Sequence, residues 1–250
     1  MLSDPVFYLV AIPAVVFAGI SKAGFGSGAS FAATPLLALV IDPALALGIL
    51  LPLLMVIDAA TLRPYWKRWS LPDAKLLMTG AVPGVALGAV LYQLANADVL
   101  RFLIGAISLA FVAYQIARSR GLIRTQNLAL GKGVGLTTGM IAGFTSFVSH
   151  AGGPPVAMYL LSRGLAKTTY QATTVLTFFA VNILKFVPYA FLGIFTAETL
   201  AANLVLVPAA LIGAWLGVLA HRLVPEAVFF AITYVLLVAA GSKLIFDALT

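Results

Sequence analysis

Residues 146–155, with the sequence SFVSHAGGPP, interrupt a long apolar segment with a histidine, two glycines and two prolines. An unbroken membrane helix does not accommodate this combination, because proline removes a backbone donor and glycine weakens a helix interior. Earlier in the chain, residues 21–30 (SKAGFGSGAS) break another apolar segment with a lysine and three glycines. Two such breaks in corresponding places predict a pair of half-sites.

The composition is typical of an integral membrane protein. Hydrophobic residues make up 62% of the 250 residues and charged residues only 9%, whereas about 25% of an ordinary soluble domain is charged. The net charge of +7 comes mostly from short loops between apolar segments, so it reports on topology and predicts no nucleic-acid partner. The chain has no cysteine, which excludes disulfides, thiolate catalysis and cysteine-based metal sites, and no cofactor is expected.

The apolar segments predict the same order of elements twice. Each half begins with a broken, re-entrant helix hairpin and continues with three transmembrane helices. The expected segments are 5–21, 29–41, 43–62, 76–94 and 99–117 in the first half, and 131–147, 156–161, 168–195, 199–220 and 225–248 in the second. The predicted fold is all-α: a polytopic transmembrane helical bundle of two inverted repeats, residues 1–125 and 126–250, in one membrane domain.

Matched residues and loop charges support the repeat and its inversion. The matches are Ala18 with Ala142, Gly19 with Gly143, Asp58 with Asn182, Pro83 with Pro208, Gly88 with Gly213 and Ala89 with Ala214. An odd number of crossings turns the second half upside down. Basic loops at 63–75, 118–132, 163–167 and 221–222 then share one side, with Arg101 and Lys243 as exceptions. The positive-inside rule predicts a cell (inner) membrane protein with both termini outside, in the periplasm.

Both breaks have the features of anion receptors. Glycines leave backbone N–H groups uncovered, and the helices expected from Ala29 and from the proline pair direct their positive dipole ends at the gaps. If the hairpin tips meet at the pseudo-two-fold axis, their polar residues line one cavity. The candidate substrate-binding residues are Ser21, Lys22, Gly24, Gly26, Ser27, Gly28, Ser30, Ser146, Ser149, His150, Gly152, Gly153, Asn182 and Lys185.

Two ionisable residues, Asp58 and Lys185, lie inside predicted crossings. A charge at the bilayer centre costs at least about 2.5–3.5 kcal/mol on insertion scales, so such residues face a cavity or a partner. One hypothesis is that Asp58 or His150 exchanges protons and couples transport to the proton gradient. The alternative is a buried Asp58–Lys185 ion pair that serves only packing.

The segment AGISKAGFGSGASFAATPLL at residues 18–37, its second copy at residues 141–161, and Asp58 in the third apolar segment resemble the sulfite exporter TauE/SafE family over nearly the whole chain. The resemblance implies a transporter of small sulfur-containing anions, among them sulfite, thiosulfate and organosulfonates, or of organic acids. The chain departs from a fully glycine-rich pattern at Ser27, Ala29 and Ser30, and its second break contains the sequence HAGGPP. These departures leave the substrate and the direction of transport open.

The leading hypothesis is a secondary transporter of a small anion that works by alternating access in the lipid bilayer, with the proton as candidate coupling ion and a homodimer as one option for its oligomeric state. An anion channel and a carboxylate transporter are alternatives, and glycine and proline could serve helix packing alone. No enzyme activity is expected, because no phosphate-binding loop, HExxH or GxSxG motif occurs. An intramembrane enzyme site at Ser149 and His150, oriented by Asp58, is a remote alternative.

Overall fold

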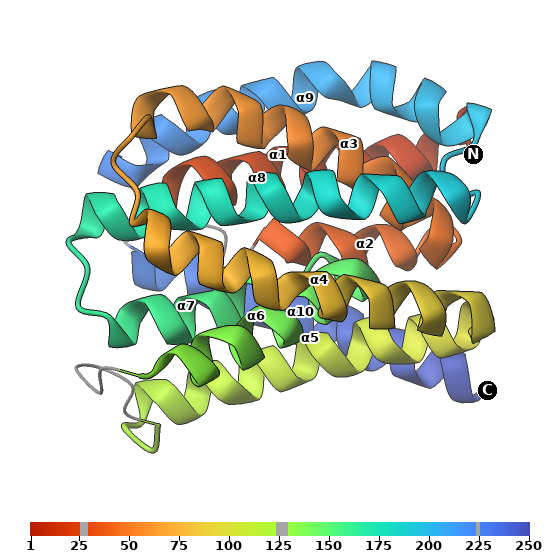
Figure 1. The fold of residues 1–250 in the computed structure, drawn as a ribbon. Helices are drawn as coiled ribbons and strands as arrows, with labels where there is room; N and C mark the ends of the chain where they lie inside the picture. The colour runs from red at the N-terminus through yellow and green to blue at the C-terminus, as the bar shows by residue number, and fades with distance from the viewer. Residues whose placement is uncertain (26–29, 124–129, 224–225) are drawn as a thin grey trace.

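The computed structural model describes residues 1–25, 30–123, 130–223 and 226–250, and the regular secondary structure in these ranges is helical. The elements are α1 (Pro5–Gly24), η1 (Ser30–Ala32), α2 (Ala33–Ala38), α3 (Pro43–Leu62), η2 (Arg63–Tyr65), α4 (Leu71–Leu94), α5 (Ala97–Ser119), α6 (Lys132–Ser149), α7 (Gly153–Ser162), α8 (Lys167–Phe191), α9 (Ala197–Leu223) and α10 (Glu226–Leu249) (Figure 1). The predicted all-α class is confirmed.

Within the described ranges, seven helices are long and apolar enough to cross a membrane: α1, α3, α4, α5, α8, α9 and α10. Large apolar side chains such as Leu94, Phe191 and Leu204 are exposed on the outside of the bundle. In water this surface would be unfavourable, but hydrocarbon chains of lipid solvate it well. The chain is therefore a multi-pass membrane protein.

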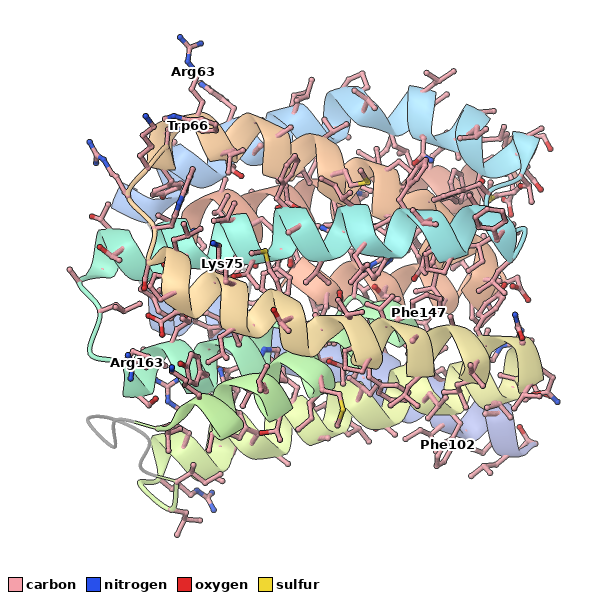
Figure 2. The ribbon with its side chains drawn as sticks, in the orientation of Figure 1. Arg63, Trp66, Lys75, Phe102, Phe147 and Arg163 are labelled. Carbon is pink, nitrogen blue, oxygen red and sulfur yellow. The ribbon has the colours of Figure 1, made fainter. Side chains whose placement is uncertain are left out.

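Both chain termini lie at one end of the bundle, and the loops that contain Arg63 and Arg163 lie at the other (Figures 1 and 2). Helices α1 and α6 consequently start from opposite ends (Figure 1). These are the directions that an inverted repeat requires. The division into repeats at residues 1–125 and 126–250 stays a prediction.

The two halves of the chain interlock through helix pairs: α1 packs on α9, α4 on α6, and α5 on α10. Small residues make the close approaches possible. A Cβ atom at Gly19 would lie 2.7 Å from the backbone of Gly213, and one at Gly143 would lie 2.9 Å from the Cα atom of Ala81. These glycines serve helix packing, as small residues do at membrane helix interfaces.

The first hairpin differs from its predicted form. Helix α1 continues to Gly24, three residues past the expected end. Gly24 has no side chain, so the last turn of α1 can pack directly against Gly217 of α9. Ser21 and Lys22 thus lie in the last helical turn, before the break. The returning arm consists of η1 and the six-residue α2, which is shorter than the predicted segment 29–41.

The second hairpin agrees more closely with the prediction. Helix α6 ends at Ser149, and His150 follows with a left-handed backbone (φ 56°), its N–H donating to the Ser146 carbonyl at 3.0 Å. Helix α7 begins at Gly153, with Pro154 and Pro155 in its first turn, where a missing N–H costs nothing.

Candidate functional site

A buried ion pair lies at the centre of the bundle. Lys22 Nζ on α1 is 2.5 Å from Asp58 Oδ1 on α3, and the two side chains are only 6% and 1% exposed. The other carboxylate oxygen of Asp58 accepts a hydrogen bond of 2.7 Å from the amide of Asn182 on α8. One cation and one amide thus stabilise a carboxylate that would otherwise be costly within a membrane.

A second buried group of contacts lies beside the first. Lys185 Nζ on α8 donates to the Ser146 carbonyl at 2.9 Å and lies 2.8 Å from His150 Nδ1. His150 Nε2 is 3.3 Å from the Leu47 carbonyl, which can only accept a hydrogen bond. Nε2 therefore carries the proton, and Nδ1 accepts from Lys185. This assigns the neutral tautomer to His150.

The alternative of an Asp58–Lys185 ion pair is wrong in this conformation. Among the described residues, Asp58 pairs with Lys22, and Lys185 bonds to His150 and the end of α6. The last carbonyl groups of a helix lack partners within it, and an ammonium group at the helix C-terminus satisfies one of them. Lys185 Nζ donates a hydrogen bond to the Ser146 carbonyl and so satisfies one of these groups at the end of α6.

A cavity of about 10 Å³ separates the two groups of contacts. Six of the predicted site residues line it together with Leu54 and Phe178: Lys22, Ser30, Ser146, His150, Gly153 and Asn182. A cavity of this volume has room for about one water molecule. Residues that flank the first break, Lys22 and Ser30, and residues of the second hairpin thus surround a space that is too small for a sulfur oxyanion.

The other predicted site residues lie outside this lining. Ser21 and Ser149 are fully buried, and Ser149 Oγ donates to the Thr145 carbonyl at 3.3 Å. Gly152 packs against Phe178, and Lys185 lies behind His150. Gly24 lines a different cavity, described below. Gly26, Ser27 and Gly28 fall outside the described residues.

The contacts of the two matched glycines do not select one alignment of the breaks. A Cβ atom at Gly88 would meet Phe147, and one at Gly213 would meet Val16. The motif SKAG at residues 21–24 is similar to SHAG at residues 149–152, and aligning the two would place Lys22 at the position of His150. The repeat, with Gly19 matched to Gly143, stays a prediction.

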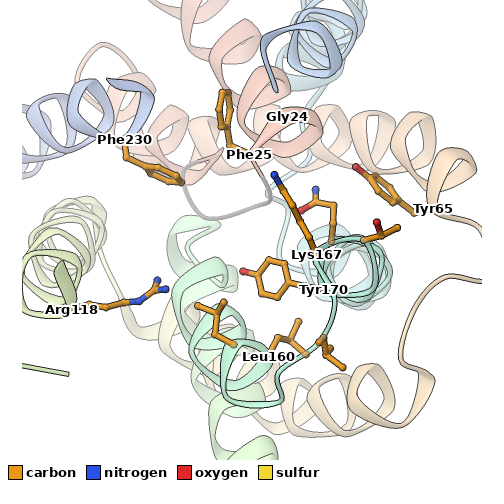
Figure 3. Close-up of a pocket in the computed structure, with 12 residues that line it drawn as sticks. Gly24, Phe25, Tyr65, Arg118, Leu160, Lys167, Tyr170 and Phe230 are labelled. Atoms are coloured by element: carbon orange, nitrogen blue, oxygen red, sulfur yellow. The ribbon is translucent and has the colours of Figure 1, made fainter. Parts of the chain in front are cut away.

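A larger cavity of about 500 Å³ lies at the end of the bundle that contains the basic loops (Figure 3). Arg118 and Tyr170 point toward each other from opposite sides of it (Figure 3). Gln171, which also lines it, donates to the Lys22 carbonyl at 3.4 Å. We call this cavity the vestibule. Sequence reasoning missed Gln171, although a polar residue in an apolar helix was a usable signal.

The opposite end of the site is closed by an apolar cluster. Leu47, Leu51, Phe147, Tyr189 and Ile194 pack together there, and each is at most 2% exposed. The Tyr189 hydroxyl donates to the Phe147 carbonyl at 2.6 Å, which fixes α8 against the end of α6. The polar cavity therefore lies nearer to solvent on the side of the vestibule.

Helix α7 is fixed to the rest of the bundle at its far end. Asp73 on α4 accepts hydrogen bonds from Arg163 Nε at 3.0 Å and from the Tyr159 hydroxyl at 3.1 Å. Its second oxygen accepts from Ser70 at 2.6 Å. A charge-assisted network of this kind is stronger than single neutral hydrogen bonds. It holds the second hairpin beside the vestibule, and sequence reasoning did not identify it.

Comparison with known proteins agrees with this architecture. The family model described as sulfite exporter TauE/SafE matches residues 11–244, nearly the whole chain. No curated protein and no solved structure matches the chain. The match covers both hairpins, every candidate site residue and the seven apolar helices apart from the start of α1 and the end of α10. The chain therefore belongs to the sulfite exporter TauE/SafE family of membrane transporters.

Proposed function

We propose that the protein is a secondary transporter that moves a small sulfur-containing oxyanion or organosulfonate, such as sulfite, thiosulfate or sulfoacetate, by alternating access. The observation that carries this proposal is the cavity between residues of the two hairpins, with Lys22, His150 and Asn182 in its lining. Ammonium and amide N–H groups are donors that suit an oxyanion, and the imidazole becomes one when His150 Nε2 leaves the Leu47 carbonyl. Small carboxylates offer the same acceptor chemistry and are the second candidate substrates.

The charges of the buried groups favour an anion. With Lys22 and Lys185 as ammonium groups and Asp58 as a carboxylate, the described centre carries one positive charge in excess. Binding of a monoanion neutralises that excess. The first turn of α7 also begins at the cavity, where the helix dipole attracts negative charge, although Pro154 and Pro155 have no N–H to donate.

Binding requires a change of conformation, because the cavity of about 10 Å³ cannot hold the substrate. We infer that the hairpins separate on the side of the vestibule in one state and on the side of the apolar cluster (residues 47, 51, 147, 189 and 194) in the other. The substrate enters in one of these states and leaves in the other. Inverted repeats with broken helices at the midplane work in this way in other secondary transporters.

We infer further that His150 couples transport to protons. His150 lines the cavity and accepts a hydrogen bond from Lys185 on Nδ1, so an entering anion and a proton would meet at one side chain. Asp58 is the other coupling candidate. At either residue a proton can bind only when a present contact changes: the Lys185 contact at His150 Nδ1, or the contacts of Asp58 with Lys22 and Asn182.

The experiment that tests the function uses purified protein in proteoliposomes. We expect preloaded unlabelled sulfite to drive transient accumulation of labelled sulfite against its gradient, and an inward proton gradient to change the uptake rate. Thiosulfate, sulfoacetate and a small carboxylate serve as competitors that rank the substrates. A unitary current without such counterflow would assign a channel, and equal uptake with and without a pH gradient would exclude proton coupling.

We propose that the vestibule opens to the cytoplasm, since basic loops surround it and basic loops are retained inside. Because the chain has no cysteine, Thr168→Cys, in the vestibule lining, is a unique labelling site. A membrane-impermeant thiol reagent is expected to label it only from the cytoplasmic side and to block transport. Thr250→Cys, at the opposite end, is the control and should label from outside without loss of transport. Labelling of both from one side would contradict the orientation.

A further inference from the structure

We propose that Asp58 takes the place of the transported anion while the carrier is empty. This inference rests on the proposed function and assigns Asp58 a role other than proton exchange. In the closed structure the carboxylate of Asp58 is bound by Lys22 and Asn182, and both of these residues line the polar cavity. Asp58 itself is absent from that lining.

The geometry makes Asp58 and the substrate competitors. A small anion in the cavity needs N–H donors, and the described side-chain donors at its wall include the ammonium group of Lys22 and the amide of Asn182. Both now contact Asp58: Lys22 forms an ion pair with it at 2.5 Å, and Asn182 donates a hydrogen bond to it at 2.7 Å. An entering anion therefore has to displace the carboxylate from at least one of them, and a departing anion returns them to it.

The role follows from the cost of an unpaired charge inside a membrane. A carrier that has released its substrate must return through the closed state, and in that state Lys22 is only 6% exposed. An ammonium group without a partner is strongly unfavourable in such a place. Asp58 supplies the negative charge that makes the empty closed state accessible. With anion bound, the substrate supplies it instead.

The pairing also gives Asn182 a role. Asn182 corresponds to Asp58 in the predicted repeat, and its amide provides one of the donors that hold Asp58.

The test is Asp58→Asn in proteoliposomes, with sulfite as the probe. We expect net uptake into substrate-free vesicles to fall at least about tenfold, because the empty carrier no longer returns, and exchange of labelled for internal unlabelled sulfite to persist. We also expect sulfite to bind the detergent-solubilised variant more tightly than wild type, since its competitor is gone. Asp58→Glu, which keeps the charge, should retain net uptake.

Asp247→Asn is the matched control, because Asp247 pairs with Lys243 at the surface of α10, far from the cavity. Equal loss of exchange and net uptake, or weaker sulfite binding in Asp58→Asn, would overturn the inference. So would loss of folded protein in both Asp58→Asn and a second neutral variant, Asp58→Ser, since Asp58 would then be structural. A third outcome is that Asp58→Asn binds sulfite more tightly than wild type while the wild-type protein shows no counterflow. This result would support Asp58 as the competitor of the anion and would reject the proposed transport function.

Discussion

Replacement of Lys185 by methionine is expected to leave the protein folded and to weaken anion binding about 10- to 100-fold, the range for loss of a charged hydrogen-bond donor. Lys185 is fully buried, and as an ammonium group it would supply the excess positive charge of the described centre. Methionine has a similar length and no charge, so the variant retains the packing and loses the electrostatic attraction.

The loss should also act through His150. Without the ammonium group, His150 Nδ1 loses the donor 2.8 Å away, and the Ser146 carbonyl loses its partner at 2.9 Å. The imidazole ring is then free to turn and no longer presents a fixed edge to the cavity. We therefore expect the maximal transport rate to fall as well as the affinity.

Calorimetric titration of sulfite into detergent-solubilised protein, together with counterflow in proteoliposomes, measures both effects. Lys243→Met is the control, since Lys243 is exposed and pairs with Asp247. Normal binding in Lys185→Met would remove Lys185 from the site. Loss of folded protein without a specific binding defect would assign it to packing, a role in which buried ionic groups are also found.

The second large effect is expected at the crossing of α4 and α6. Gly84→Val should lower the free energy of unfolding by at least about 1–3 kcal/mol, the usual cost of overpacking. A Cβ atom at Gly84 would lie 2.8 Å from the Phe144 nitrogen and still closer to the Met140 carbonyl. Both are backbone atoms of a helix and cannot turn aside, so α4 and α6 would have to separate.

Thermal unfolding in detergent, followed by size-exclusion chromatography, measures this loss. Gly133→Val provides the same substitution on α6 at a place where a Cβ atom meets nothing within 4 Å. We expect that control to unfold near the wild-type temperature. If Gly84→Val were equally stable, the close crossing of α4 and α6 would be refuted. Because α6 leads directly to His150, partial separation should also reduce anion binding.

Several features of the site could be predicted from sequence because they depend on composition along the chain. A lysine, a histidine and clustered glycines and prolines within apolar segments are conspicuous, and insertion energetics require that they face a cavity or a partner. The structure brings Lys22, Ser30, Ser146, His150, Gly153 and Asn182 together around one cavity. Their role in binding stays a prediction.

The partners of the charged residues could not be predicted in this way. The sequence suggested Lys185 as the ion-pair partner of Asp58, but the partner depends on which helix ends point at each other. Lys22 lies in the last turn of α1, because that helix continues to Gly24, and so reaches Asp58. Lys185 meets the unsatisfied carbonyl of Ser146 and the imidazole of His150. These contacts join segments more than thirty residues apart, and no local pattern encodes them.

The sequence by itself determined the membrane class, the all-helical fold, the positions of the two breaks and the family, because hydrophobic run length and glycine, proline and charge placement act locally. Only the tertiary structure decided the Lys22–Asp58–Asn182 and Lys185–His150 pairings and the small cavity with a vestibule on one side. The physical reason is that close helix crossings at glycine fix these distances. Each crossing depends on two segments that are far apart in the sequence, so neither segment predicts it alone.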